Sequence, residues 1–137
     1  MIAIIPARGG SKGIIGKNLR ELCGMPLIYW TIDAVLKCDQ VSKVFVTTDD
    51  KEISLISKKF GAEVINRPVE LAQDDSMMID VLKHAIKVLD EQNLKDESVL
   101  LLQPTSPLRN SWSIADAIRI FYESTCKSLV SIQEVPH

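Results

Sequence analysis

The stretch Ile2-Ala-Ile-Ile-Pro-Ala-Arg-Gly-Gly-Ser-Lys-Gly-Ile-Ile-Gly-Lys-Asn18 joins an apolar run to a basic loop rich in glycine. The run Ile2–Ile5 has a length suited to a buried strand, and Pro6 has no N–H group with which to continue the pairing. Glycine allows a ligand to approach the backbone closely, and N–H groups flanked by cations suit a polyphosphate. The stretch therefore predicts a first strand that leads into an anion-binding loop, with a flexible, solvated connection as the alternative.

Three cations and four glycines interleave along this loop, namely Arg8, Lys12 and Lys17 with Gly9, Gly10, Gly13 and Gly16. A Walker-type loop has four residues between its first glycine and Gly-Lys, whereas five residues separate Gly10 from Gly16. In addition, Asn18 follows the lysine in place of Ser or Thr. The dinucleotide pattern Gly-x-Gly-x-x-Gly is also absent. The loop is therefore of another kind, placed after a first strand, where open α/β sheets bind ligands.

The composition is that of one soluble globular domain over residues 1–137, with 25% charged and 46% hydrophobic residues. A net charge of −2 argues against general nucleic-acid binding, which usually shows a basic excess. No apolar run approaches the ~18 residues of a membrane span, and no basic region precedes the first apolar run as in a signal peptide. Three widely spaced cysteines predict neither a disulfide framework nor a zinc motif. We therefore expect a cytoplasmic protein with reduced cysteines.

Apolar runs typical of strands alternate with helical patterns, as in βαβ units with a parallel sheet. We therefore predict an α/β fold of three layers, α/β/α, with a mostly parallel, Rossmann-like sheet. The expected strands are Ile2–Ile5, Val44–Thr48, Glu63–Ile65, Val99–Leu102 and Leu129–Ile132, the fourth of them central because it is the most hydrophobic. The expected helices run from Pro26 to about Lys37, from about Lys51 to Gly61, from one of Asp74, Asp75 and Ser76 past Leu89, and, with a capping box of Ser113 and Asp116, through Ile114 to Phe121.

Polar residues follow several of the expected strands. Asp49 and Asp50 end the second strand, where one carboxylate would cap the next helix; the pair could otherwise hold a metal ion. Arg67, fixed by the proline after it, would reach into a shared crevice or lie on the surface as an ordinary arginine. Gln103 starts a stiff turn with two prolines. Its amide would bind a pyrimidine edge, hold a water beside the phosphates, or serve only the turn.

Four stretches match a known signature in their order and spacing, namely Ala7-Arg-Gly-Gly-Ser-Lys-Gly13 with Lys17-Asn18, Val46–Asp49, Arg67–Ala72 and Leu102–Arg109. Together they resemble the N-acylneuraminate cytidylyltransferases, the CMP-sialic acid synthetases and their relatives. The resemblance implies a fold of the nucleotide-diphospho-sugar transferase type. It also implies that CTP reacts with an N-acylated nine-carbon 2-keto sugar acid, similar to sialic acid, to give the CMP-sugar and pyrophosphate.

The resemblance implies a role for each matching residue of the first loop and of two later turns. Gly9, Gly10 and Ser11 would supply backbone and hydroxyl donors, and Arg8 and Lys12 would bind the β- and γ-phosphates. Lys17 would bind the α-phosphate, and Asn18 would bind the ribose or the base. Arg67 and Gln103 would hold the nucleoside and the edge of the sugar site. Catalysis would rest on Lys17 and Arg8, because fixed cations stabilise the charge that develops on the phosphates. Mg²⁺ would bridge the phosphates, and its protein ligands stay open.

The family's usual chain is longer than 137 residues, and its later part supplies most of the sugar pocket, the dimerisation segment and the metal carboxylates. We therefore expect residues 1–137 to form the CTP-binding portion of an enzyme that is a homodimer at full length. One alternative is a CTP-binding domain without catalysis. Another is a cytidylyltransferase for a different keto sugar acid such as KDO, although the turn Gln103-Pro-Thr-Ser-Pro107 matches the nine-carbon class. Ile15 stands where many relatives have proline, which implies a less rigid loop.

Overall fold

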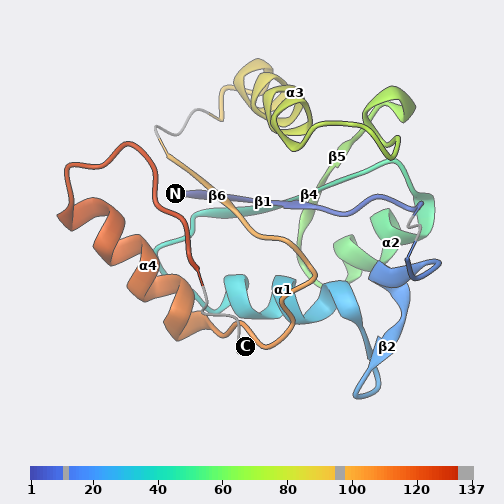
Figure 1. The fold of residues 1–137 in the computed structure, drawn as a ribbon, viewed down its shortest axis with the longest axis horizontal. Helices are drawn as coiled ribbons and strands as arrows, with labels where there is room; N and C mark the ends of the chain where they lie inside the picture. The colour runs from blue at the N-terminus through green and yellow to red at the C-terminus, as the bar shows by residue number, and fades with distance from the viewer. Residues whose placement is uncertain (11–12, 95–97, 133–137) are drawn as a thin grey trace.

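Four parallel strands form the central sheet, in the spatial order β5-β4-β1-β6 (Figure 1). The computed structural model describes residues 1–10, 13–94 and 98–132. The strands are β1 (Ile2–Pro6), β4 (Lys43–Thr48), β5 (Glu63–Asn66) and β6 (Val99–Leu101). The helices are α1 (Leu27–Leu36), α2 (Lys51–Lys59), α3 (Met78–Glu91) and α4 (Ser111–Glu123), with two 3₁₀ turns, η1 (Lys17–Leu19) and η2 (Val69–Leu71). The predicted α/β fold with its parallel sheet is confirmed.

The sheet separates two hydrophobic cores, so the fold has three layers. In Figure 1, α3 lies above the sheet, and α1 and α4 lie below it. Successive side chains of a strand point to opposite faces, and accordingly Ile5 of β1 joins the core shared with α1, α2 and α4, whereas Ile4 joins the core shared with α3. Val46 and Phe45 of β4 divide in the same way. Helices cover both faces, which explains why these strands are continuous apolar runs.

A short antiparallel hairpin, β2 (Glu21–Leu22) with β3 (Met25–Pro26), links the first loop to α1 and has no counterpart among the expected elements. Its turn residues Cys23 and Gly24 have φ angles of 51° and 78°. Positive φ at both central positions is typical of type I′ turns, whose twist suits hairpin strands. The indole N–H of Trp30 donates to the carbonyl of Leu22 at 3.1 Å and holds the hairpin on α1. Strands of two residues are too short to leave a periodic pattern in the sequence.

Two expectations about the sheet are wrong. Within the described sheet β6 is an edge strand, whereas β1 and β4 have neighbours on both sides. Val99 of β6 is accordingly 37% exposed, while every residue of β1 is buried. The segment Leu129–Ile132 forms no strand in the described part of the chain, and Val130 and Ile132 are 78% and 93% exposed. An apolar run becomes a strand only where a neighbour satisfies its backbone groups, and none of the described strands does so.

Two helix starts also differ from the prediction. The capping box of Ser113 with Asp116 is wrong because Asn110 caps α4, its Oδ1 accepting from the Ser113 N–H at 2.9 Å. Asp116 instead forms an ion pair within the helix. α3 begins at Met78 without a side-chain cap. Asp74, one of its three predicted starting residues, is part of an ion pair with the first loop.

The three cysteines are free, with Cys38 buried and Cys23 and Cys126 exposed. Across residues 1–10, 13–94 and 98–132, no helix combines the length and the apolar character that a membrane crossing needs. The fold is therefore held by its two hydrophobic cores and its sheet, without a cross-link between these cysteines.

Candidate functional site

A polar pocket of about 390 Å³ lies at the carboxyl ends of the parallel strands. Its lining comes from the segments that follow β1, β5 and β6, together with η1 and the start of α3. Parallel strands share one edge for their carboxyl ends, so residues that are far apart in the chain meet there. Five of the predicted site residues line this pocket, namely Arg8, Lys17, Asn18, Arg67 and Gln103.

The remaining predicted site residues belong to the first loop. Gly9 and Gly10 lie beside the pocket without lining it, and Ser11 and Lys12 lie outside the described residues. The lining also contains Asp74, for which the sequence suggested only a helix start. No local pattern marks Asp74 as a pocket residue, because Arg8, with which it forms an ion pair, lies far from it in the sequence.

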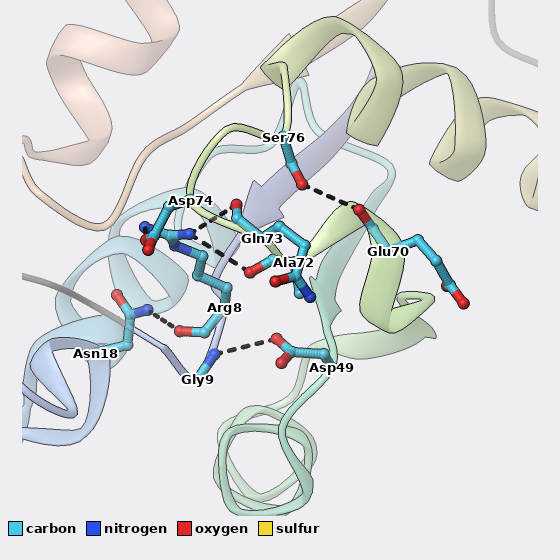
Figure 2. A network of polar contacts seen from close by, with 9 residues as sticks. All are labelled: Arg8, Gly9, Asn18, Asp49, Glu70, Ala72, Gln73, Asp74 and Ser76. Carbon is cyan, nitrogen blue, oxygen red and sulfur yellow. Dashed lines mark hydrogen bonds and ion pairs between the residues drawn. The ribbon is translucent and has the colours of Figure 1, made fainter.

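Arg8 is already engaged by the protein, as Figure 2 shows. Its Nη1 donates to the carbonyl oxygens of Gln73 at 2.7 Å and of Ala72 at 3.4 Å. Its Nη2 forms an ion pair with Oδ1 of Asp74 at 2.8 Å. All three partners belong to the segment between η2 and α3. The guanidinium therefore links the loop after β1 to this segment.

Gly9 brings the first loop against the end of β4. Its N–H donates to Oδ1 of Asp49 at 3.1 Å (Figure 2), and a Cβ at this position would lie only 2.6 Å from Oδ2 of Asp50. Asp50 is itself fixed, since its Oδ1 caps α2 by accepting from the N–H groups of Glu52 and Ile53 at 2.8 and 2.9 Å. The predicted cap by one of the two aspartates is thus confirmed. Position 9 requires glycine because of this close approach.

Asn18 fixes the other end of the loop. Its side chain is buried, and its Nδ2 donates to the carbonyl oxygen of Arg8 at 3.0 Å. Gly16, just before η1, has a φ of 61°, a conformation that favours glycine. Lys17 lies between them at the start of η1, and within the described parts of the chain its ammonium group has no hydrogen bond or ion pair. Among the described residues that line the pocket, Lys17 is therefore a cation without a side-chain partner, on a fixed backbone.

Arg67 is a buried cation at the base of the pocket, with only 7% of the residue exposed. Its Nη2 donates to the carbonyl oxygen of Thr47 at 2.6 Å, and its Nε lies 3.4 Å from Oγ1 of the same residue. Burial lowers the pKa of its guanidinium, and the charge of Arg8 lowers this pKa further, while Asp49 raises it. Since an arginine stays protonated in proteins, Arg67 adds a fixed positive charge next to that of Arg8.

Gln103 follows β6 at the opposite wall of the pocket and is exposed. Its Oε1 lies 3.5 Å from the hydroxyl of Thr105, and its carbonyl oxygen lies 3.5 Å from Nη1 of Arg109. Pro104, the next residue, is buried and anchors the turn. The side-chain amide of Gln103 therefore has donor capacity that the turn does not use.

Magnesium would have few protein ligands here. The described ranges hold no group of three or more histidine, cysteine, aspartate or glutamate side chains that could bind a metal ion. Asp49 and Asp50 contact the Gly9 N–H and the start of α2. Mg²⁺ commonly binds one or two carboxylates together with substrate phosphates and water. These residues therefore fit magnesium only as an ion carried mainly by the phosphates of a ligand.

A family model described as Cytidylyltransferase matches residues 2–136 of this chain. Over 121 residues the chain is 42% identical to the N-acylneuraminate cytidylyltransferase of Escherichia coli O18:K1:H7, a match that covers 88% of this chain and 28% of that protein. Over 136 residues it is 40% identical to the CMP-N,N'-diacetyllegionaminic acid synthase of Legionella pneumophila, covering 98% of this chain and 58% of that protein. The chain thus spans between about a quarter and three fifths of the length of these relatives.

The fold is also similar to solved structures. One of them, described as CMP:2-keto-3-deoxy-manno-octonic acid synthetase complexed with CTP, superposes with a TM-score of 0.73 at 23% identity. The match covers 89% of this chain and 47% of that chain. This likeness confirms the predicted α/β fold.

Proposed function

Because this chain belongs to the cytidylyltransferase family, we propose that its polar pocket binds CTP and that the protein activates an N-acylated nine-carbon 2-keto sugar acid. The products would be the CMP-sugar and pyrophosphate. The names of the relatives support this class of sugar acid, since one is a synthase of CMP-N,N'-diacetyllegionaminic acid and the other an N-acylneuraminate cytidylyltransferase. The observation that carries the proposal is the meeting of Arg8, Lys17 and Arg67 with Gln103 in one pocket.

The reaction needs positive charge around a triphosphate. The anomeric hydroxyl of the sugar acid attacks the α-phosphorus, the bond from that phosphorus to the bridging oxygen breaks, and pyrophosphate leaves in line. Such transfer depends on positioning and on neutralisation of charge. Lys17 suits the α-phosphate because its ammonium has no partner among the described residues and its backbone is held in η1. Loss of one fixed donor to the developing charge typically costs ~3 kcal/mol of transition-state stabilisation.

The β- and γ-phosphates would lie along the first loop. Arg8 and Lys12 would bind their oxygens, and Gly9, Gly10 and Ser11 would donate backbone and hydroxyl hydrogen bonds. The N–H of Gly9 donates to Oδ1 of Asp49, so this donor would have to exchange its partner when phosphate binds. The first loop lies close to the end of β4, where the Gly9 N–H contacts Asp49. This contact keeps the backbone donors of the loop at the carboxyl edge of the sheet and supports the proposed position of the phosphates.

The nucleoside and the sugar acid would occupy the rest of the pocket. Arg67 would hold the nucleoside end from below, and Gln103 would contact the base or the edge of the sugar site with its exposed amide. The Nδ2 group of Asn18 already donates to the Arg8 carbonyl, which leaves its amide oxygen for the ribose or the base. Magnesium held mainly by the phosphates of CTP would supply charge neutralisation during the transfer.

The full-length protein is proposed to be a homodimer in the cytoplasm. A CTP-binding domain without catalysis is the second candidate for this chain. The partial match to the relatives supports this candidate, since the chain covers only 28% of one of them and 58% of the other.

A pyrophosphate-release assay with CTP and Mg²⁺ tests these proposals. N-acetylneuraminate, N,N'-diacetyllegionaminate and KDO would be offered in parallel. We expect release with a nine-carbon acid. Binding of CTP without release from any acid would favour the second candidate, and release with KDO alone would overturn the nine-carbon assignment.

A further inference from the structure

The contacts of Arg8 are of two kinds. Its Nη1 donates to two neutral carbonyl oxygens of the backbone, whereas its Nη2 contacts the charged carboxylate of Asp74 at 2.8 Å (Figure 2). A guanidinium has donors in a fixed planar fork, so one side of the fork can change its partner while the other keeps its own. The backbone carbonyls therefore suffice to orient Arg8, and the contact with Asp74 is separable from them.

Asp74 lines the same pocket as Lys17 and Arg67. A triphosphate in this pocket would place several negative charges near the Asp74 carboxylate, and like charges repel. The phosphate oxygens and the Asp74 carboxylate also prefer the same geometry on a guanidinium. The ligand and Asp74 therefore compete for one side of Arg8.

The segment that carries Asp74 has contacts of its own that do not involve Arg8. The Ser76 hydroxyl donates to the carbonyl of Glu70 at 3.1 Å (Figure 2), and the Gln73 side chain donates to the carbonyl of Val69 at 2.8 Å. Both contacts tie the segment back to η2. Loss of the ion pair would therefore leave the segment folded.

We propose that the Asp74 carboxylate competes with the triphosphate of CTP for the Nη2 side of the Arg8 guanidinium and is displaced from it when CTP binds. This inference rests on the proposed function, because it concerns the same pocket. The β- and γ-phosphates take the Nη2 side of the guanidinium, while the Gln73 carbonyl keeps the Nη1 side. Asp74 thus weakens the binding of ligands that carry these phosphates, such as CTP, and leaves the binding of CMP unaffected.

Calorimetric titration of Asp74→Asn with CTP, CMP and inorganic tripolyphosphate, in EDTA, tests the exchange. Asparagine keeps an acceptor for Arg8 and removes the charge. CTP and tripolyphosphate should bind roughly three- to five-fold tighter than to the unchanged protein, the range of a half-exposed ion pair. CMP affinity should stay the same. The matched control is Asp75→Asn, since Asp75 is exposed and does not line the pocket; its effect should stay below about two-fold.

The same titration in the Arg8→Ala variant separates competition at Arg8 from simple removal of charge. If Asp74 acts through Arg8, the gain from Asp74→Asn should fall to less than about two-fold when Arg8→Ala is already present, because contacting residues couple in a double-mutant cycle. An equal gain with and without Arg8 would overturn the inference and leave only general repulsion.

The remaining outcomes separate this inference from the proposed function. CTP binding that Asp74→Asn leaves unchanged or weakens would overturn the inference alone. A loss seen only when Mg²⁺ replaces EDTA would also overturn it, since Asp74 would then be a metal ligand. Failure of the unchanged protein to bind CTP both in EDTA and with Mg²⁺ would overturn the inference and the proposed function together.

Discussion

Arg8 and Lys17 line one pocket but differ in what they contact. The guanidinium of Arg8 binds two carbonyls and a carboxylate of a distant segment. The ammonium of Lys17 has no such partner in the described residues, while its backbone is held by the turn η1. At the scale of single residues, Lys17 is therefore ready to meet an anion, and Arg8 must first exchange a partner.

Replacement of Lys17 by alanine tests its proposed contact with the α-phosphate. Pyrophosphate release should fall by about 10²- to 10³-fold, because a fixed donor to the reacting phosphate is lost. The melting temperature should be unchanged, since the removed ammonium contacts no other described group. Lys58→Ala, an exposed position of α2, is the matched control and should retain full release. Activity retained in Lys17→Ala would refute the placement.

Replacement of Gly9 by alanine tests the close approach of the first loop to β4. The new Cβ would lie 2.6 Å from a carboxylate oxygen of Asp50 that cannot retreat without disturbing the cap of α2. The free energy of unfolding should fall by about 1–3 kcal/mol, as for other overpacked sites. Urea denaturation measures this change. Gly10→Ala is the control, because a Cβ there meets nothing within 4 Å; equal losses at both positions would contradict the described loop.

At the scale of elements, the sequence predicts best where a pattern is long and local. β1 and β4 are runs of apolar and β-branched residues, and Asp50 stands directly before the helix that it caps. The pattern fails where the deciding partner is distant. Arg8 and Gln73 are 65 positions apart, so no periodicity reveals that Arg8 contacts this segment. The segment Leu129–Ile132 has the composition of a strand but no partner strand among the described elements.

The start of α4 allows a direct test between two caps. Asn110→Ala should lower the free energy of unfolding by about 1 kcal/mol, because the Ser113 N–H loses its acceptor. Ser113→Ala should cost only a few tenths of a kcal/mol, because the backbone N–H of residue 113 still donates to Asn110 and only the exposed hydroxyl contact at 3.0 Å is lost. Thermal unfolding of both variants measures the difference. A larger loss for Ser113→Ala would restore the capping box as the true start of the helix.

At the scale of the whole molecule, the pocket follows from the topology. Because the strands are parallel, the carboxyl ends of β1, β5 and β6 lie at the same edge of the sheet. Arg8, Arg67 and Gln103 follow these ends and therefore line one pocket. The alternation of strands and helices in the sequence was sufficient to predict that meeting place. The hairpin β2–β3 and the edge position of β6 could not be predicted from the sequence, because both depend on which strands pair with each other.

Calorimetric titration of this chain with CTP, with and without Mg²⁺, measures the central proposal most directly. We predict heat of binding for CTP and weaker binding for CMP, which lacks the phosphates assigned to Arg8 and the first loop. A well-folded chain that takes up no CTP under either condition would contradict the assignment of the pocket.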